Sequence, residues 1–245
     1  MFQPASLKGA SPTPIDERIR KKYLILYYTL IVLSFLPLAF FQYIYIRLFW
    51  TQERLVLFFL LFPFNVFFSM YLLQFCALFI SALVLILVKL IHPPREGQFS
   101  RDPQDKDYFY WNLRNLIKKW PLFLSASNPF PWAKNRFMLR ILGTKIGKDC
   151  ICDNGWISSE LVSIGKNVIL GMGSTVLTFG IEQEKFLLKR IIIEDNAVIG
   201  AKCVLLPGTH IKKGAKLSAH SYTAYNATLE EGGLYMGHPA ELKEE

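Results

Sequence analysis

Residues 191–211 read IIIEDNAVIGAKCVLLPGTHI, and a large aliphatic residue recurs at every sixth position, at Ile193, Ile199, Leu205 and Ile211. A half-buried strand alternates with a period of about two and an amphipathic helix with a period of about 3.6, so this spacing fits neither. A fixed short period is typical of a solenoid, in which every repeat makes one short strand and one turn.

The period extends over most of the C-terminal half, and a small residue usually stands four positions after each aliphatic one. Stacked coils hydrogen-bond along the axis at a spacing of about 4.8 Å. The sequence therefore predicts a parallel β-helix over residues 146–245. Its inward positions are Ile146, Cys152, Ser158, Ile164, Leu170, Val176, Ile193, Ile199, Leu205, Ile211, Leu217, Thr223, Leu229 and Tyr235.

The repeat is interrupted once, between Thr178 and Arg190, which predicts a loop over residues 179–189 that leaves the coil. The register places His210 and His220 on the outside. If the loop uses up one coil, His210 shares a column with Thr175. Three cysteines, Cys150, Cys152 and Cys203, take inward positions, where packing is the expected role of a free thiol.

The N-terminal half is apolar in a different way. The whole chain is 52% hydrophobic and has a net charge of +9. Residues 23–46 and 55–88, however, contain no charged residue. A bilayer core of about 30 Å is crossed by ~20 apolar helical residues. We predict a transmembrane helical hairpin over residues 23–94, with Pro63 dividing a lead-in from the second span, Asn65–Ile91. Whether residues 55–91 cross once or twice stays open.

Basic residues set the expected orientation. Residues 1–22 form a basic segment, and residues 108–148 contain eight basic residues and no acidic one. The positive-inside rule then places both ends, and the β-helix, on the cytoplasmic side. If Pro63 divides two full spans, the β-helix lies on the opposite side.

Residues 95–145 are predicted to connect the two halves. Leu113, Leu116, Ile117 and Trp120 share one helical face, Arg114, Lys118 and Lys119 share the other, and Pro121 ends the pattern. This predicts an amphipathic helix on an anionic leaflet. The alternative is a helix packed on the next domain. A second short helix is expected over Asn135–Leu142, capped by Gly143. Nothing in this basic region has a nucleic-acid-binding pattern, so no nucleic acid partner is expected.

Two motifs carry a resemblance to a known family. Ile199–Gly208 is close to "IGAGSVVLPG" and Gly237–Ala240 is similar to "GNPA" of the hexapeptide-repeat acyltransferases, whose fold is a left-handed parallel β-helix. Leu139–Gly147 further resembles "LRLLGAKIG" in the membrane-anchored C-terminal modules of Pls/PosA-like poly-lysine synthetases. The fold class expected is thus a two-helix transmembrane hairpin followed by an all-β left-handed β-helix.

The resemblance implies transfer of an acetyl or other acyl group from acyl-CoA to a hydroxyl or amine of a membrane-associated or surface-polymer acceptor. It also implies a homotrimer with sites between subunits. Two other functions stay open, a catalytically inactive trimeric membrane scaffold and an amide-bond-forming module. By resemblance, the residues that bind acyl-CoA are Leu205, Pro207, Gly208, Lys213, Gly237, His238, Pro239 and Ala240.

The family's general base is the histidine of a Thr-His pair beside the loop, and this chain has Thr178-Phe179 there. A phenylalanine cannot accept a proton. The candidates for another base are His210, His220 and Glu182, with His238 in the closing motif as a weaker one. The related carbonic anhydrases need three histidines at a metal, and no suitable trio occurs, so no metal is expected.

Overall fold

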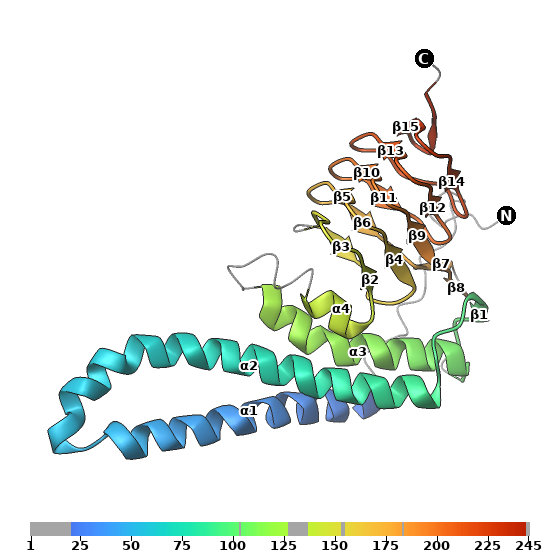
Figure 1. Ribbon diagram of the computed structural model, residues 1–245. Coiled ribbons are helices and arrows are strands. Elements are labelled where there is room, and N and C mark those ends of the chain that lie inside the picture. Colours follow the sequence, from blue (N-terminus) through green and yellow to red (C-terminus); the bar gives the residue numbers. More distant parts are fainter. Residues whose placement is uncertain (1–20, 103, 127–136, 153–154, 183, 244–245) are drawn as a thin grey trace. The chain divides into compact units, whose positions relative to one another are not determined.

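The computed structural model describes residues 21–102, 104–126, 137–152, 155–182 and 184–243 (Figure 1). Contacts divide the chain into two units. A helical unit contains residues 21–91 and 113–126, and a β-helix unit contains residues 92–112 and 137–243. The basic segment predicted over residues 1–22 lies almost entirely outside the described residues, and so does Asn135.

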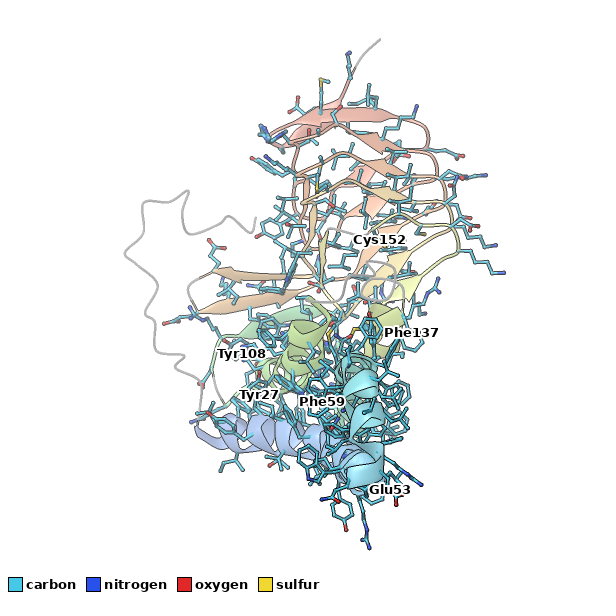
Figure 2. The ribbon with its side chains drawn as sticks, turned by 90° about the vertical axis from the view of Figure 1, so that its left-hand side faces the viewer. Tyr27, Glu53, Phe59, Tyr108, Phe137 and Cys152 are labelled. Carbon is cyan, nitrogen blue, oxygen red and sulfur yellow. The ribbon has the colours of Figure 1, made fainter. Side chains whose placement is uncertain are left out.

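In the helical unit, α1 (Lys21–Phe49) and α2 (Leu55–Ile91) are joined through the short 3-10 helix η2 (Gln52–Arg54). Both long helices have the length and the apolar composition that crossing a membrane requires. Their large apolar side chains, among them Phe59, project away from the ribbon (Figure 2). The two apolar helices predicted from the sequence are confirmed.

Pro63 does not interrupt α2, which runs through it as one helix of 37 residues, so the predicted lead-in and the predicted span belong to a single helix. At about 1.5 Å per residue, this helix is roughly 55 Å long. A proline removes one backbone donor but leaves the other hydrogen bonds of the helix in place. The segment therefore remains helical on both sides of Pro63.

Polar side chains join α1 to α2. Gln42 Nε2 donates to Asn65 Oδ1 (3.2 Å) and to Ser69 Oγ (2.5 Å), and Asn65 Nδ2 donates back to Gln42 Oε1 (3.0 Å). Tyr45 Oη donates to the carbonyl of Phe58 at 2.7 Å. Interhelical side-chain hydrogen bonds of this kind hold apolar helices together where hydrophobic burial cannot.

The connector helix differs from the prediction. α3 (Lys106–Ala126) does not end at Pro121. Arg114 and Lys118 are each only 1% exposed, whereas Lys119 is exposed. Gln74 of α2 donates to the carbonyl of Leu124 at 3.2 Å, so the C-terminal part of α3 packs on α2. The predicted contact of the connector with a lipid leaflet stays a prediction.

In the β-helix unit, parallel strands form three faces of a coil, which we call faces 1, 2 and 3 in chain order (Figure 1). Face 1 contains β2 (Lys145–Ile146), β4 (Val162–Ile164), β9 (Ile191–Ile193), β12 (His210–Ile211) and β14 (Thr228–Leu229). Face 2 contains β5 (Ile169–Leu170), β10 (Val198–Ile199), β13 (Lys216–Leu217) and β15 (Leu234–Gly237). Face 3 contains β3 (Trp156–Ile157), β6 (Thr175–Val176) and β11 (Val204–Leu205).

The predicted inward residues line the axis of this coil, and Cys152 lies inside it (Figure 2). Ser158 is the exception. Ile157 pairs with Val176 and fills the axis instead, one residue earlier than the period predicts. Ser158 is buried beside the axis, and its Oγ accepts a hydrogen bond from the backbone N–H of Thr178 at 3.3 Å.

Corners of the coil explain two further features of the repeat. The third residue after an axis position has a positive φ, as at Asn167 (53°) and Asn196 (63°), a conformation that asparagine tolerates well. The residue directly after the axis position is often glycine. At Gly171 and Gly200 an added Cβ would run into the backbone of the next coil, so no larger residue fits there.

The predicted loop 179–189 does leave the coil, but it is a β-hairpin. β7 (Phe179–Glu182) and β8 (Lys185–Leu188) pair antiparallel, and β1 (Gly97–Ser100) adds a third strand beside β8. Phe186 and Leu188 of this small sheet are buried against Tyr108 and Trp111. An aromatic cluster thus fixes the hairpin to the segment that follows α2 in the chain.

The remaining short elements begin and end the solenoid. α4 (Leu139–Leu142) precedes β2, and Gly143 caps it with a φ of 114°, which confirms the predicted glycine cap. At the other end, β16 (Ala240–Leu242) folds back antiparallel on β15. The backbone N–H of Ala240 donates to the carbonyl of Tyr222 at 2.7 Å, so the closing motif is held against face 3.

Candidate active site

Phe179 stands where the family resemblance places the catalytic histidine. Its ring lies 4.9 Å from that of Trp111 (centroid to centroid) and packs against the buried aromatic cluster. It therefore serves as a packing residue of the hairpin. The structure offers no proton acceptor from the side chain at this position.

His210 lies on face 1, on the outer side of β12, and it is held by a carboxylate. Its Nε2 is 2.7 Å from Glu194 Oε1, and the two side chains are 35% and 41% exposed. The second oxygen of Glu194 accepts from the backbone N–H of Lys213 at 3.1 Å. An imidazole oriented by a third group is the arrangement that activates histidine as a base.

The predicted alignment of His210 with Thr175 is wrong. Thr175 belongs to face 3 and pairs with Val204, whereas His210 pairs with Ile192 and Thr228 on face 1. The hairpin is inserted at the corner between faces 3 and 1 and uses up no coil. The assumption of a lost coil is what displaced the register.

The other two candidate bases occupy different places. His220 is exposed at a corner with a φ of 61°, where its backbone N–H donates to the carbonyl of Ala201 at 2.9 Å. Glu182 ends β7 at the tip of the hairpin. Burial, together with the charge of Glu182, raises the pKa of the Tyr225 hydroxyl. The structure does not bring His210, His220 and Glu182 into one site.

The residues expected to bind acyl-CoA fall into separate groups. Leu205 is fully buried in the axis, so its side chain cannot contact a ligand outside the coil, and that expectation is corrected. Pro207 is buried and Gly208 has a φ of 84° at the corner between faces 3 and 1. Lys213 is exposed at the corner between faces 1 and 2. His210 lies between Gly208 and Lys213 on the same coil.

The closing motif forms the third group, away from Gly208 and Lys213. Gly237, Pro239 and Ala240 make the turn between β15 and β16, and the backbone N–H of Gly237 donates to Ser221 Oγ at 3.1 Å. The ring of His238 is exposed and stacks on that of Tyr222, with 5.4 Å between the ring centroids. One copy of the chain therefore distributes the expected acyl-CoA residues over three corners of the coil.

Glu194 is the one residue of this site that sequence reasoning missed. A signal for it exists, because it directly follows the axis residue Ile193, at the place where Gly147, Gly165, Gly171 and Gly200 stand in other coils. A charged side chain at a glycine position reaches along face 1 to the next coil. Among the residues that the structure describes, no group of three His, Cys, Asp or Glu side chains is placed to hold a metal ion.

Comparison with known proteins agrees with this geometry. The model of the hexapeptide repeat of succinyl-transferase matches residues 161–182 and 190–222, on both sides of the hairpin. A Bacillus subtilis protein named as an acetyltransferase, YvoF, is 29% identical over 123 residues, which is 49% of this chain and 70% of that protein. The β-helix unit is therefore similar to the hexapeptide-repeat domains of acyl-transferring enzymes.

Two solved structures are among those similar to this chain. A hexapeptide-repeat acetyltransferase of Vibrio cholerae complexed with acetyl-coenzyme A is 18% identical, with a TM-score of 0.44, over 58% of this chain and 91% of the other. A galactoside acetyltransferase in complex with coenzyme A is 16% identical, with a TM-score of 0.44, over 54% of this chain and 80% of the other. The hexapeptide-repeat match and the Bacillus subtilis relative do not support the narrower resemblance to poly-lysine-synthetase modules.

Proposed function

We propose that this protein is a membrane-anchored acetyltransferase that moves an acetyl group from acetyl-CoA to a hydroxyl or amine. The observation that carries the proposal is a three-faced parallel β-helix that matches the hexapeptide-repeat model on both sides of its one insertion. The acceptor would be a membrane-associated or surface-polymer molecule, because the helical hairpin would hold the β-helix close to the bilayer.

Face 1 supports the co-substrate part of this proposal. A single coil carries Gly208, His210 and Lys213 in this order. Gly208 gives a corner without a side chain at one end, and Lys213 gives an exposed ammonium group at the other. A lysine at this place offers a point charge to the phosphates of acetyl-CoA. The neighbouring Lys212 is already paired, since its Nζ is 2.5 Å from Glu230 Oε2.

Face 2 supports assembly with further copies of the chain, as a homotrimer. Its outer column is apolar at four of five positions, and exposed Met172, Met236 and Leu242 flank it. An exposed apolar column of this kind is a candidate for contact with another copy, and a stable interface takes ~800 Å² from each partner. A second copy would also bring a closing motif from one chain to face 1 of another. The column, in register, is Ile151, Ile169, Val198, Lys216 and Leu234.

Membrane anchoring and the cytoplasmic side rest on the sequence. The apolar surfaces of α1 and α2 match the hydrocarbon of a bilayer. The basic residues before and after the helical hairpin favour a cytoplasmic location of the β-helix, on the side of the membrane where acetyl-CoA is supplied. An N-terminal segment rich in lysine and arginine would add attraction to anionic lipids.

Calorimetry on the full chain in detergent micelles tests the function. Acetyl-CoA should bind, and Lys213→Glu should weaken the binding about tenfold, which is ~1.4 kcal/mol. Lys148→Glu is the matched control, because Lys148 takes the same corner position in the first coil and should leave binding unchanged. Absence of binding at millimolar acetyl-CoA would favour the second candidate, a non-catalytic trimeric scaffold, which Phe179 at the usual base position also favours.

A further inference from the structure

A carboxylate and an imidazole meet on face 1 across two coils. Glu194 follows β9, and His210 lies on β12, the next strand of the same sheet. Their contact of 2.7 Å is the distance of a charge-assisted hydrogen bond. The backbone N–H of Glu194 donates to the carbonyl of Ile211 at 2.9 Å, so hydrogen-bonded backbone holds the two residues side by side.

Two separate donors hold the Glu194 carboxylate in place. One oxygen faces His210 Nε2, and the other accepts the backbone N–H of Lys213 at 3.1 Å. A carboxylate can only accept hydrogen bonds when it is ionised, so the Nε2 atom of His210 must carry the proton. When the ring is neutral, its free electron pair is then on Nδ1.

We propose that His210 is the general base of this protein, relocated from the loop to β12, and that Glu194 is the residue that positions it. The proposal rests on the acetyltransferase function above and names the site at which it occurs. Phe179 cannot act at the usual place, whereas His210 is both held by a partner and 35% exposed to an approaching acceptor. Thr228, its register partner on β14, offers an exposed hydroxyl on the same face.

The step balances without any further reagent. Nδ1 of His210 takes the proton from the acceptor's O–H or N–H group, and the acceptor atom forms a bond to the carbonyl carbon of acetyl-CoA. The carbon–sulfur bond then breaks, and the imidazolium returns the proton to the CoA thiolate. Glu194 stabilises the transient imidazolium and keeps the ring in the orientation that presents Nδ1.

Other charged groups lie around this pair. Lys212 and Lys213 follow His210 on its own strand, and Glu230 follows β14 and binds Lys212. On the β9 side, Glu194 is the charged group that faces the ring. The pH profile of the reaction is therefore expected to reflect the imidazole together with this set of charges.

Thiol release from acetyl-CoA, with water as the acceptor, tests the proposal on the full chain in detergent. His210→Gln keeps an amide donor for Glu194 but has no basic nitrogen, so the rate should fall about 10²- to 10⁴-fold while acetyl-CoA binding persists. Glu194→Gln should lower the rate by a smaller factor and move the pH profile. Lys145→Gln, in the same outer column of the first coil, is the control that should keep the full rate.

Nitrogen-15 shifts of the His210 ring give a second readout, which a purely structural pair would not change. The wild type should show the neutral ring protonated on Nε2, and Glu194→Gln should shift the tautomer balance. Undiminished thiol release by His210→Gln would overturn the inference and leave the acetyltransferase function intact. A wild type that binds acetyl-CoA but releases no thiol would count against the inference and the acetyltransferase function together. A wild type that does not bind acetyl-CoA would refute both.

Discussion

The two units of this protein use apolar residues in opposite directions. In the helical unit the large apolar side chains point outward, and amide and hydroxyl groups of Gln42, Asn65 and Ser69 meet between the helices. In the β-helix unit the aliphatic residues fill the axis, and the charged ones lie on the outside of the coil. The first arrangement leaves an apolar surface and the second a polar one.

This difference also explains why the sequence of the β-helix unit predicts the position of each side chain and the sequence of the helical unit does not. Outward apolar side chains impose no period, so residues 23–91 predict length and composition but little about which residues touch. An axis filled from three faces imposes a strict period of six, so the β-helix sequence predicts the place of each side chain. Exchanging polarity at chosen positions should therefore affect the two units in opposite ways.

The largest effect is expected in the axis. Ile199 is buried to 1% exposure, and Ile199→Ala should lower the stability of the β-helix by about 2–5 kcal/mol because it leaves a cavity. The same change at Ile86, which is 55% exposed on α2, should have little effect. Hydrogen exchange of the β-helix strands in the full chain measures both, and equal protection in the two variants would contradict the comparison.

A smaller effect is expected between the helices. Gln42→Leu removes the partner of Asn65 and Ser69 and should destabilise the hairpin by about 0.6–2 kcal/mol. Loss of helicity at 222 nm during titration with a denaturing detergent measures this, with Gln52→Leu in exposed η2 as the control. Adding Asn65→Leu should restore part of the loss, since replacing both partners leaves no buried amide unpaired. A double variant weaker than either single one would argue against this role.

The smallest effect concerns the ion pair of Glu96 with Arg190, whose Nε lies 3.0 Å from Glu96 Oε1. Burial alone would raise the pKa of Glu96, but the hydrogen bonds and charge of Arg190 outweigh it and lower that pKa. A carboxyl with a lowered folded-state pKa stabilises the fold above its unfolded-state pKa, and this contribution disappears as the pH falls through the lowered value.

Glu96→Gln should therefore reduce stability at pH 7 and should make no difference in acid below the lowered pKa. The pair is about half exposed, so the effect should stay below about 1 kcal/mol. Melting temperatures at neutral and acidic pH measure it, with Glu231→Gln at an exposed turn for comparison. A loss of the same size at both pH values would show that the effect is not electrostatic.

Much of the β-helix could be predicted from the period alone, because Ile164, Ile199 and Ile211 have no alternative place in a three-faced coil. The period failed at Ser158, because in the first coil the axis residue is Ile157, one position earlier. A shift of one residue within a single coil does not change the composition, so no sign of it is visible in the sequence. The hairpin was predicted only as a departure from the coil. Its pairing with β1 joins segments about ninety residues apart, and residues 97–100 show no strand pattern of their own.

The candidate site was predicted in part. His210 was identified by its outward register, but its column was misplaced by the assumption that the insertion replaces a coil. Glu194 went unnoticed because a diagonal contact between coils depends on the stacking order, which only the three-dimensional register provides. In the connector, the amphipathic pattern of residues 113–120 was real, yet a pattern of charges does not say whether water, lipid or protein covers them.

The strand β1 has a consequence for the order in which the protein forms. Its partner Leu188 is synthesised about ninety residues after Gly97. At about 5–20 residues per second, a ribosome needs on the order of 5–20 s to cover that distance. During this interval β1 has left the ribosome without its partner, and the aromatic side chains of Tyr108 and Trp111 still lack Phe186. The small sheet therefore closes late in synthesis, and a chaperone that shields exposed aromatic residues would have its target in this segment.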